Sequence, residues 1–242
     1  MKRVLLILLL VISGQISNRS FAQSQFSGWL ATFNTFKTGK KTSIHSDIQL
    51  RSSDEFGKIQ SLLLRAGLNV HLSKRLIVTT GYAYIQNRRV IGAVNGYTPE
   101  HRIWEQFLYN QKAGPVFMAH RFRIEQRFIS KPVVVNGELA TDGYGSANRF
   151  RYFTRNILPL RKQPVFEKGV FAVLQNEVFL NFGNKANVNG KTFDQNRLYL
   201  AAGYRFSKSF DMDAGYMNQY INGRANQFTN NHIIQLAGYI RL

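Results

Sequence analysis

Two stretches of the chain carry their charged side chains on alternating positions of one parity, and this spacing is the first feature that could support chemistry. The stretch 120–128 reads H-R-F-R-I-E-Q-R-F, and the stretch 149–155 reads R-F-R-Y-F-T-R. The charged parity comprises Arg121, Arg123, Glu125 and Arg127 in the first stretch and Arg149, Arg151 and Arg155 in the second. Successive side chains of a β-strand point to opposite faces. Each stretch therefore predicts a strand with one charged face and one mostly apolar face.

Rows of arginine on one face of a sheet have two ordinary uses. They line pores that select anions, or they pair with carboxylates and fill the inside of a small barrel. The sequence leaves both uses open and favours filling, because a barrel of about ten strands has little free space once arginine side chains enter it. The residues predicted to line such a lumen are Arg65, Glu105, Arg121, Arg123, Glu125, Arg127, Arg149, Arg151, Arg155, Glu177, Arg197 and Arg205.

Catalytic and metal-binding patterns are sparse. None of the five histidines lies in a G-x-S-x-G, H-E-x-x-H or H-x-S-N-G motif. His45 and Asp47 share a predicted inward face and could act as a base and its orienting partner, although a polar pair inside a lumen is the simpler interpretation. His120 lies on the outward parity, where an anchor at a membrane interface suits it better than catalysis. The chain has no cysteine, no His/carboxylate cluster and no phosphate-binding loop, so we expect no catalytic site, metal or cofactor.

The N-terminal segment has the features of a secretory signal. Lys2 and Arg3 precede the apolar run 4–12, and Ser20-Phe21-Ala22 places small residues at the positions that a signal peptidase reads. We expect Met1–Ala22 to be removed and 23–242 to form a single exported domain. No later segment stays apolar over the length of a membrane-spanning helix, so no helical membrane span is expected. The net charge of +19 is interpreted as a charged lumen and attraction to anionic lipid headgroups, with no nucleic-acid partner.

Alternating or aromatic-rich segments follow one another along the rest of the chain, and no helix of useful length is predicted. We expect strands at 26–36, 41–51, 59–72, 76–88, 102–111, 116–129, 148–158, 170–182, 197–206, 210–220 and 232–242. The connections between them alternate in length. Long polar loops are expected at 89–100, 130–146, 183–194 and 222–231, and short turns at 73–74, 112–115 and 207–209.

These segments predict an all-β fold, namely a transmembrane, antiparallel, up-and-down β-barrel of about 10–12 strands. Strands of about 10–14 residues exceed those of soluble sheets and match the length needed to cross hydrocarbon at a tilt. Arginine facing lipid would cost roughly 2–4 kcal/mol near mid-bilayer, so the charged parity should point inward. The alternative is a soluble secreted sandwich or a lipocalin-like barrel. Single-chain bacterial barrels have even strand numbers, so the eleven segments leave ten strands, without 26–36, or twelve.

A set of short motifs in this order resembles the DUF2490 family. It includes R-A-G-L-N-V-H-L-S at 65–73, E-H-R-I-W-E-Q at 100–106, H-R-F-R-I-E-Q-R-F at 120–128, G-Y-R-F-S at 203–207 and G-Y-M-N-Q at 215–219. The resemblance covers most of the chain after the signal. It implies a barrel in the outer membrane of Bacteroidetes and related Gram-negative bacteria, and it implies no activity.

The sequence therefore predicts an outer-membrane barrel of a structural or binding type and favours it over an enzyme. A narrow channel for anionic or small solutes is the second hypothesis, and an enzyme that acts on membrane lipid is the third. The expected partners are outer-membrane lipid, lipopolysaccharide and the barrel-assembly machinery, which reads C-terminal strands that resemble 232–242.

Overall fold

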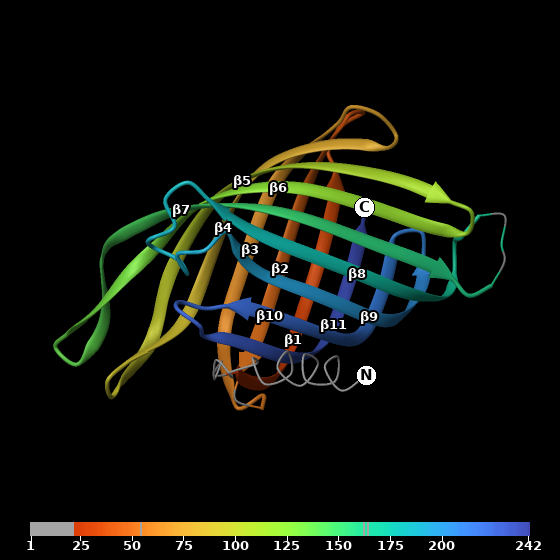
Figure 1. The fold of residues 1–242 in the computed structure, drawn as a ribbon. Coiled ribbons are helices and arrows are strands. Elements are labelled where there is room, and N and C mark those ends of the chain that lie inside the picture. Colours follow the sequence, from red (N-terminus) through yellow and green to blue (C-terminus); the bar gives the residue numbers. More distant parts are fainter. Residues whose placement is uncertain (1–21, 54, 162, 164) are drawn as a thin grey trace, which may run out of the picture.

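The structure is a computed structural model that describes residues 22–53, 55–161, 163 and 165–242. The predicted signal, Met1–Ala22, lies outside the described residues except for Ala22, which begins the first strand. The regular elements described are eleven strands (Figure 1). They are β1 (Ala22–Lys37), β2 (Thr42–Ser53), β3 (Lys58–His71), β4 (Leu76–Ile91), β5 (Val94–Ala113), β6 (Val116–Val135), β7 (Glu138–Pro159), β8 (Gly169–Phe182), β9 (Phe193–Ser207), β10 (Phe210–Asn222) and β11 (Phe228–Arg241).

The eleven strands form one closed barrel in sequence order. Each strand pairs antiparallel with the next, and the barrel closes by a parallel pairing of β1 with β11 that runs from Ala22↔Phe228 to Thr35↔Arg241. The prediction of an all-β barrel is confirmed, but both strand numbers inferred from the even-number rule, ten and twelve, are wrong. The segment 26–36 belongs to the wall. With an even number of strands, the first and last strands would pair antiparallel. With eleven strands, β1 runs in the same direction as β11, and the two pair in parallel.

The strands are strongly staggered around the barrel. Stepping across the paired residues from Lys37, at the end of β1, once around the wall leads back to Gln23, near the start of the same strand. A stagger of this size requires strands tilted by roughly 35–45° to the barrel axis. The tilt places side chains of distant strands at one level of the lumen.

The connections divide the barrel into two ends. The turn end carries the connections 38–41, 72–75, 114–115 and 208–209 and the described residues between β7 and β8. The loop end carries 55–57, 92–93, 136–137, 183–192 and 223–227. Two predicted long loops, 89–100 and 130–146, are instead strand extensions that form the β4–β5 and β6–β7 hairpins projecting from the wall (Figure 1). Positive φ angles at Gly92 (58°), Asn136 (51°) and Gly137 (81°) make their tight turns possible.

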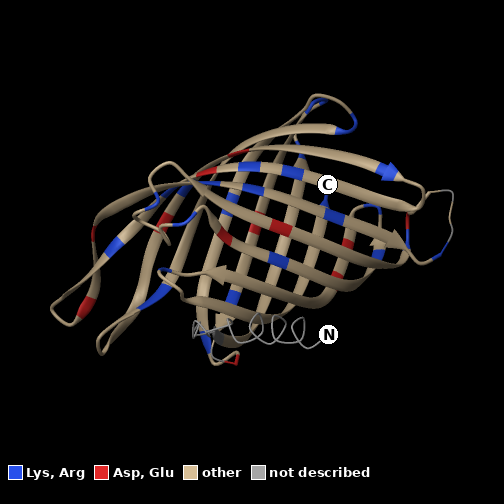
Figure 2. Cartoon of the chain, in the orientation of Figure 1, with Lys and Arg blue, Asp and Glu red and all other residues tan. Residues whose placement is uncertain are grey.

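The two faces of the wall differ in chemistry. Charged positions lie along the middle of the strands and not only in the connections (Figure 2). Each of the eleven strands exposes at least one large apolar or aromatic side chain on the outside: Leu30, Ile48, Leu68, Val78, Ile103, Ile124, Leu158, Leu174, Leu200, Tyr216 and Ile234. Among the described residues, no helix is long and apolar enough to cross a membrane.

Candidate functional site

The inside of the barrel holds most of the residues predicted to line the lumen. Those that face inward, on alternate positions of β3 and β6–β9, are Arg65, Arg121, Arg123, Glu125, Arg127, Arg149, Arg151, Arg155, Glu177, Arg197 and Arg205. The wall brings them together because β6 and β7 pair in a register that sets Arg123 beside Arg151 and Glu125 beside Arg149.

Glu105 is the exception, and its predicted place in the lumen is wrong. It lies exposed on the outer wall of β5, where Gln126 donates a hydrogen bond to it over 3.2 Å. Its neighbour Trp104 is fully buried inside instead. The indole fills the space left by two paired glycines, since a Cβ on Gly67 or Gly81 would lie 2.7 or 2.4 Å from its ring. The fit of this large ring therefore decides the parity of β5.

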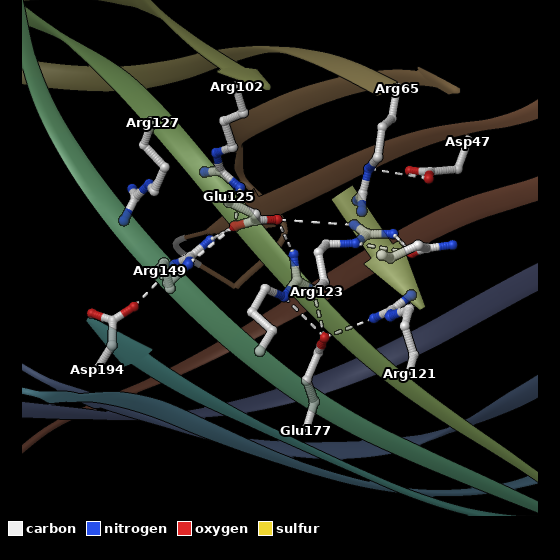
Figure 3. Close-up of polar contacts among 12 residues, drawn as sticks. Asp47, Arg65, Arg102, Arg121, Arg123, Glu125, Arg127, Arg149, Glu177 and Asp194 are labelled. Atoms are coloured by element: carbon white, nitrogen blue, oxygen red, sulfur yellow. Dashed lines mark hydrogen bonds and ion pairs between the residues drawn. The ribbon is translucent and has the colours of Figure 1, made fainter. Parts of the chain in front are cut away.

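Two carboxylates organise the middle layer of the lumen, which we define as Glu125, Glu177 and the arginines paired with them (Figure 3). Glu125 accepts from Arg149 at 2.7 Å and from Arg151 at 2.5 Å. Glu177 accepts from Arg151 at 2.6 Å and from Arg121 at 2.7 Å. Arg151 thus joins the two carboxylates, and the layer forms one connected network across β6, β7 and β8.

The middle layer is densely packed. Arg123 is 1% exposed and Glu125 is 2% exposed. The Arg123 guanidinium lies 4.3 Å from the centre of the Trp104 ring and donates to Gln106 over 2.6 Å. Side chains that lined an open aqueous pore would be in contact with water. The low exposure of the described residues at this level shows a filled lumen.

Further ion pairs and an apolar cluster occupy the turn end. Asp213 accepts from Arg155 at 2.5 Å and from the Tyr199 hydroxyl at 2.7 Å, and Arg205 pairs with Asp211 at 2.9 Å. Phe166, from the connection 160–168, is buried against Phe171. Its carbonyl accepts from Arg205 at 2.9 Å, which fixes this connection at the turn end. A cavity of about 200 Å³ lies between this region and the middle layer.

The predicted His45–Asp47 pair exists inside the barrel. His45 Nε2 lies 3.0 Å from Asp47 Oδ2, on the inward face as expected. Asp47 also accepts from Gln49 at 3.1 Å and pairs with Arg65 at 3.2 Å. Because the carboxylate is shared with a permanent cation, the pair belongs to the ion-pair network. His120 lies on the outer wall, 3.0 Å from the Tyr152 hydroxyl.

A larger cavity opens at the loop end, and we call it the mouth chamber. Its volume is about 410 Å³. The charged residues that line it are Arg51, Arg65, Arg89, Arg102, Arg127, Arg149, Arg151, Arg197, Glu100 and Asp194. Eight arginines and two carboxylates line the chamber. Three of these arginines also pair closely with carboxylates beyond it: Arg65 with Asp47, Arg149 with Glu125, and Arg151 with both Glu125 and Glu177. Glu100 accepts from Arg102 and from Arg127, each at 2.7 Å, and Asp194 accepts from Arg149 at 2.9 Å.

Three arginines of the mouth chamber have no close carboxylate among the described residues: the exposed Arg89 and the half-buried Arg51 and Arg197. Arg51 donates to the amide oxygen of Gln49 at 2.6 Å, and its Nε is buried without a hydrogen-bond partner. Arg197 approaches Glu177 only to 3.9 Å. Both guanidinium groups stack on the Trp29 ring, at 4.1 Å for Arg51 and 4.9 Å for Arg197. The indole thus contacts both guanidinium groups.

Sequence reasoning missed several charged residues of the lumen: Arg51, Arg102, Glu100, Asp194, Asp211 and Asp213. Arg51 follows the polar parity of its strand, so the alternation itself could have identified it. Glu100 and Asp194 fall in segments expected to be loops, where parity carries no information. Among the described residues, no group of three or more His, Asp or Glu side chains could hold a metal ion.

Comparison with family models gives one relevant match. The model described as "Protein of unknown function (DUF2490)" matches residues 26–230, which is most of the chain. The chain therefore belongs to the DUF2490 family, as the ordered motifs predict. Comparison with curated proteins and with solved structures found no match.

Proposed function

We propose that this member of the DUF2490 family is an outer-membrane β-barrel whose lumen serves as a binding chamber and not as a through-channel. The observation that carries the membrane assignment is the polarity of the wall. Charged side chains fill the inside, while exposed apolar residues surround the outside on every strand. A soluble protein rarely exposes a continuous apolar surface of this extent.

The closed sheet supports the same assignment. Lipid offers no hydrogen bonds to the backbone, so a spanning sheet must close on itself. The seam pairs β1 with β11 continuously from Ala22 to Thr35 and leaves no open edge along the wall. On the outside, Leu30 is 54% exposed, Ile48 is 51% and Leu200 is 53% exposed. Hydrocarbon would cover these side chains.

The N-terminal signal pattern and the barrel together support a location in the outer membrane. An exported barrel of this kind would reach the outer membrane of a Gram-negative cell through the barrel-assembly machinery. Short turns of such barrels face the periplasm and longer loops face outward. By that rule, the mouth chamber opens to the cell surface, where the β4–β5 and β6–β7 hairpins would meet lipopolysaccharide.

A matched pair of variants tests the membrane assignment. Leu200 lies near the centre of β9 on the outer wall. In liposomes, Leu200→Arg should lower the free energy of unfolding by roughly 2–4 kcal/mol, whereas Leu200→Ala should cost less because it places no charge in hydrocarbon. The unmodified chain should fractionate with outer membranes and show a heat-dependent gel shift. A monomer in the periplasmic fraction would overturn the membrane assignment.

The packed middle layer supports binding over transport. Arg123, Glu125 and Glu177 are each 4% exposed or less, so this level leaves little space for ions between the mouth chamber and the smaller cavity on its other side. We expect planar bilayers that contain the protein to remain silent. A steady anion-selective conductance that disappears in the double variant Arg123→Ala/Arg151→Ala would replace the binding barrel with the channel hypothesis.

A further inference from the structure

We propose that the mouth chamber binds a phosphate group, free or as the monoester of a larger molecule, between the guanidinium groups of Arg51 and Arg197. This inference rests on the proposed binding barrel and gives its site a ligand class. Three features of the chamber support it: an excess of positive charge, an unsatisfied arginine, and surroundings built to hold both cations in place.

The charge excess is local to the mouth chamber. Eight arginines face two carboxylates there, and Glu100 and Asp194 are each already bound to other arginines. Taking a charged group out of water is costly unless an opposite charge compensates it. The protein supplies that compensation to Arg65, Arg102, Arg127, Arg149 and Arg151, and it leaves Arg51 and Arg197 without a close carboxylate.

Arg51 shows the deficiency most directly. Its hydrogen-bond partner is a neutral amide, and its Nε has none. Arg65, Arg102, Arg151 and Arg197 line the same chamber as Arg51. A guanidinium group in such surroundings is repelled by its neighbours. An anion bound beside it would turn this repulsion into attraction.

The surroundings keep the two cations oriented. Trp29 is buried and supports both guanidinium planes. With its amide in the orientation that satisfies its neighbours, Gln219 accepts from Arg197 Nε and Nη2, each at 3.1 Å, and Gln195 accepts from Arg197 at 3.4 Å. These bonds fix Arg197 to the wall. At the rim, Asn189 lines the chamber and donates to the Asn222 carbonyl at 2.8 Å. The site is therefore preorganised by β1, β2, β9 and β10 together with the connection 183–192.

The chemistry of the donors favours phosphate. A guanidinium group presents a planar fork of N–H donors that matches two oxygens of a phosphate. Two such groups on one indole can hold different oxygens of one tetrahedral dianion, whereas a carboxylate presents only two oxygens in one plane. The opening at the loop end leaves room for the remainder of a phosphate monoester.

Calorimetry on the full chain in detergent tests the site. The titrants are inorganic phosphate and glucose 6-phosphate, with acetate and glucose as negative controls, at constant chloride concentration. Arg51→Gln and Arg197→Gln should each weaken phosphate binding about tenfold or more, because each removes a charged donor. The matched control is Arg75→Gln, which removes an exposed arginine at the turn end and should change the affinity less than about twofold.

Each result decides the question. Binding of inorganic phosphate assigns the free ion, and binding of glucose 6-phosphate alone assigns the monoester. The site is overturned if neither phosphate binds, or if Arg75→Gln weakens binding as much as Arg51→Gln does. A heat-dependent gel shift checks that each variant is folded. Should Arg51→Gln fail to fold, Arg51→Lys keeps the charge, loses the fork and should still weaken binding.

The test separates this inference from the proposed function. Binding in detergent does not require that the barrel spans a membrane or that it lacks conductance. A conducting or soluble barrel that binds phosphate through Arg51 would overturn the proposed function and keep the site. A silent, membrane-inserted barrel without phosphate binding would overturn only the site.

Discussion

The middle layer and the mouth chamber are built from the same residue type and differ in what surrounds it. In the middle layer, Glu125 and Glu177 each bind two arginines within 2.7 Å. In the mouth chamber, Arg51 has an amide as its partner and Arg197 lies 3.9 Å from a carboxylate. Arg121, Arg149 and Arg151 are therefore held by short ion pairs, whereas Arg51 and Arg197 are available to bind an anion.

The difference shows how one alternating pattern can serve stability and recognition together. A buried ion pair contributes little compared with an apolar core, but removing one partner leaves an uncompensated charge and is strongly destabilising. Pairs in the middle layer should therefore resist change. Arg51 and Arg197 have no carboxylate closer than 3.9 Å, so the fold should tolerate their loss while the site does not.

The largest expected effect is in the middle layer. Glu125→Ala should lower the free energy of unfolding by about 3–5 kcal/mol, because it removes the carboxylate that compensates the buried charges of Arg149 and Arg151. Urea titration of the folded barrel in liposomes measures this change. The exposed pair of Glu167 with Lys208, also at 2.7 Å, supplies the control. Glu167→Ala should cost at most about 1 kcal/mol, and equal losses in both variants would show that burial makes no difference to these pairs.

Phosphate should stabilise the barrel by acting on the mouth chamber alone. At a concentration ten times its dissociation constant, phosphate should raise the free energy of unfolding by about 1.4 kcal/mol, because it binds only the folded state. Urea titrations with and without phosphate measure the gain. Arg51→Gln should remove it at the same phosphate concentration, and a gain that persists in this variant would place the bound ion elsewhere.

Glu100 competes with an external anion for the arginines at the rim. Glu100→Gln should therefore strengthen phosphate binding by about twofold to fivefold, since it removes a negative charge from the chamber. Calorimetry with inorganic phosphate measures the affinity. Glu138→Gln, at an exposed position near the tip of the β6–β7 hairpin, is the control and should leave it unchanged. Weaker binding in Glu100→Gln would mean that Glu100 positions the arginines instead of opposing the ligand.

The smallest expected effect discriminates best between the two levels of the barrel. Without phosphate, Arg51→Gln should change the free energy of unfolding by no more than about 0.5 kcal/mol, and toward greater stability, because repulsion among arginines decreases. The same urea assay applies. A loss as large as that of Glu125→Ala would show that Arg51 is structural and that the two levels do not differ.

Sequence alternation predicts the inner face well wherever charge decides the parity. Arg121, Arg123 and Arg127 share their strand with apolar partners of opposite parity, and the barrel places all three inside. Alternation fails at Glu105, because Trp104 needs the space over Gly67 and Gly81. A rule that assigns residues to the two faces by polarity does not predict that the Trp104 ring lies on the inner, charged face.

The two missed hairpins have a related cause. Gly92, Pro99, Asn136 and Gly137 indicate loops when each residue is taken alone. In the barrel, Pro99 lies just beyond Glu100, where the pairing of β5 with β6 begins, so its missing N–H interrupts no pairing with β6. The β6–β7 register also shifts at Pro132. Residues that break an isolated strand are tolerated at an unpaired edge, at a bulge or in a two-residue turn.

The parallel pairing of β1 with β11 determines at which end of the barrel each end of the wall lies. Because the number of crossings is odd, β1 begins at the loop end and β11 finishes at the turn end. Anything joined ahead of β1 and anything joined behind β11 would then lie in different compartments once the wall is in a bilayer. In an even barrel the two attachments share one side. In this barrel, the start of β1 and the end of β11 lie at opposite ends of the wall.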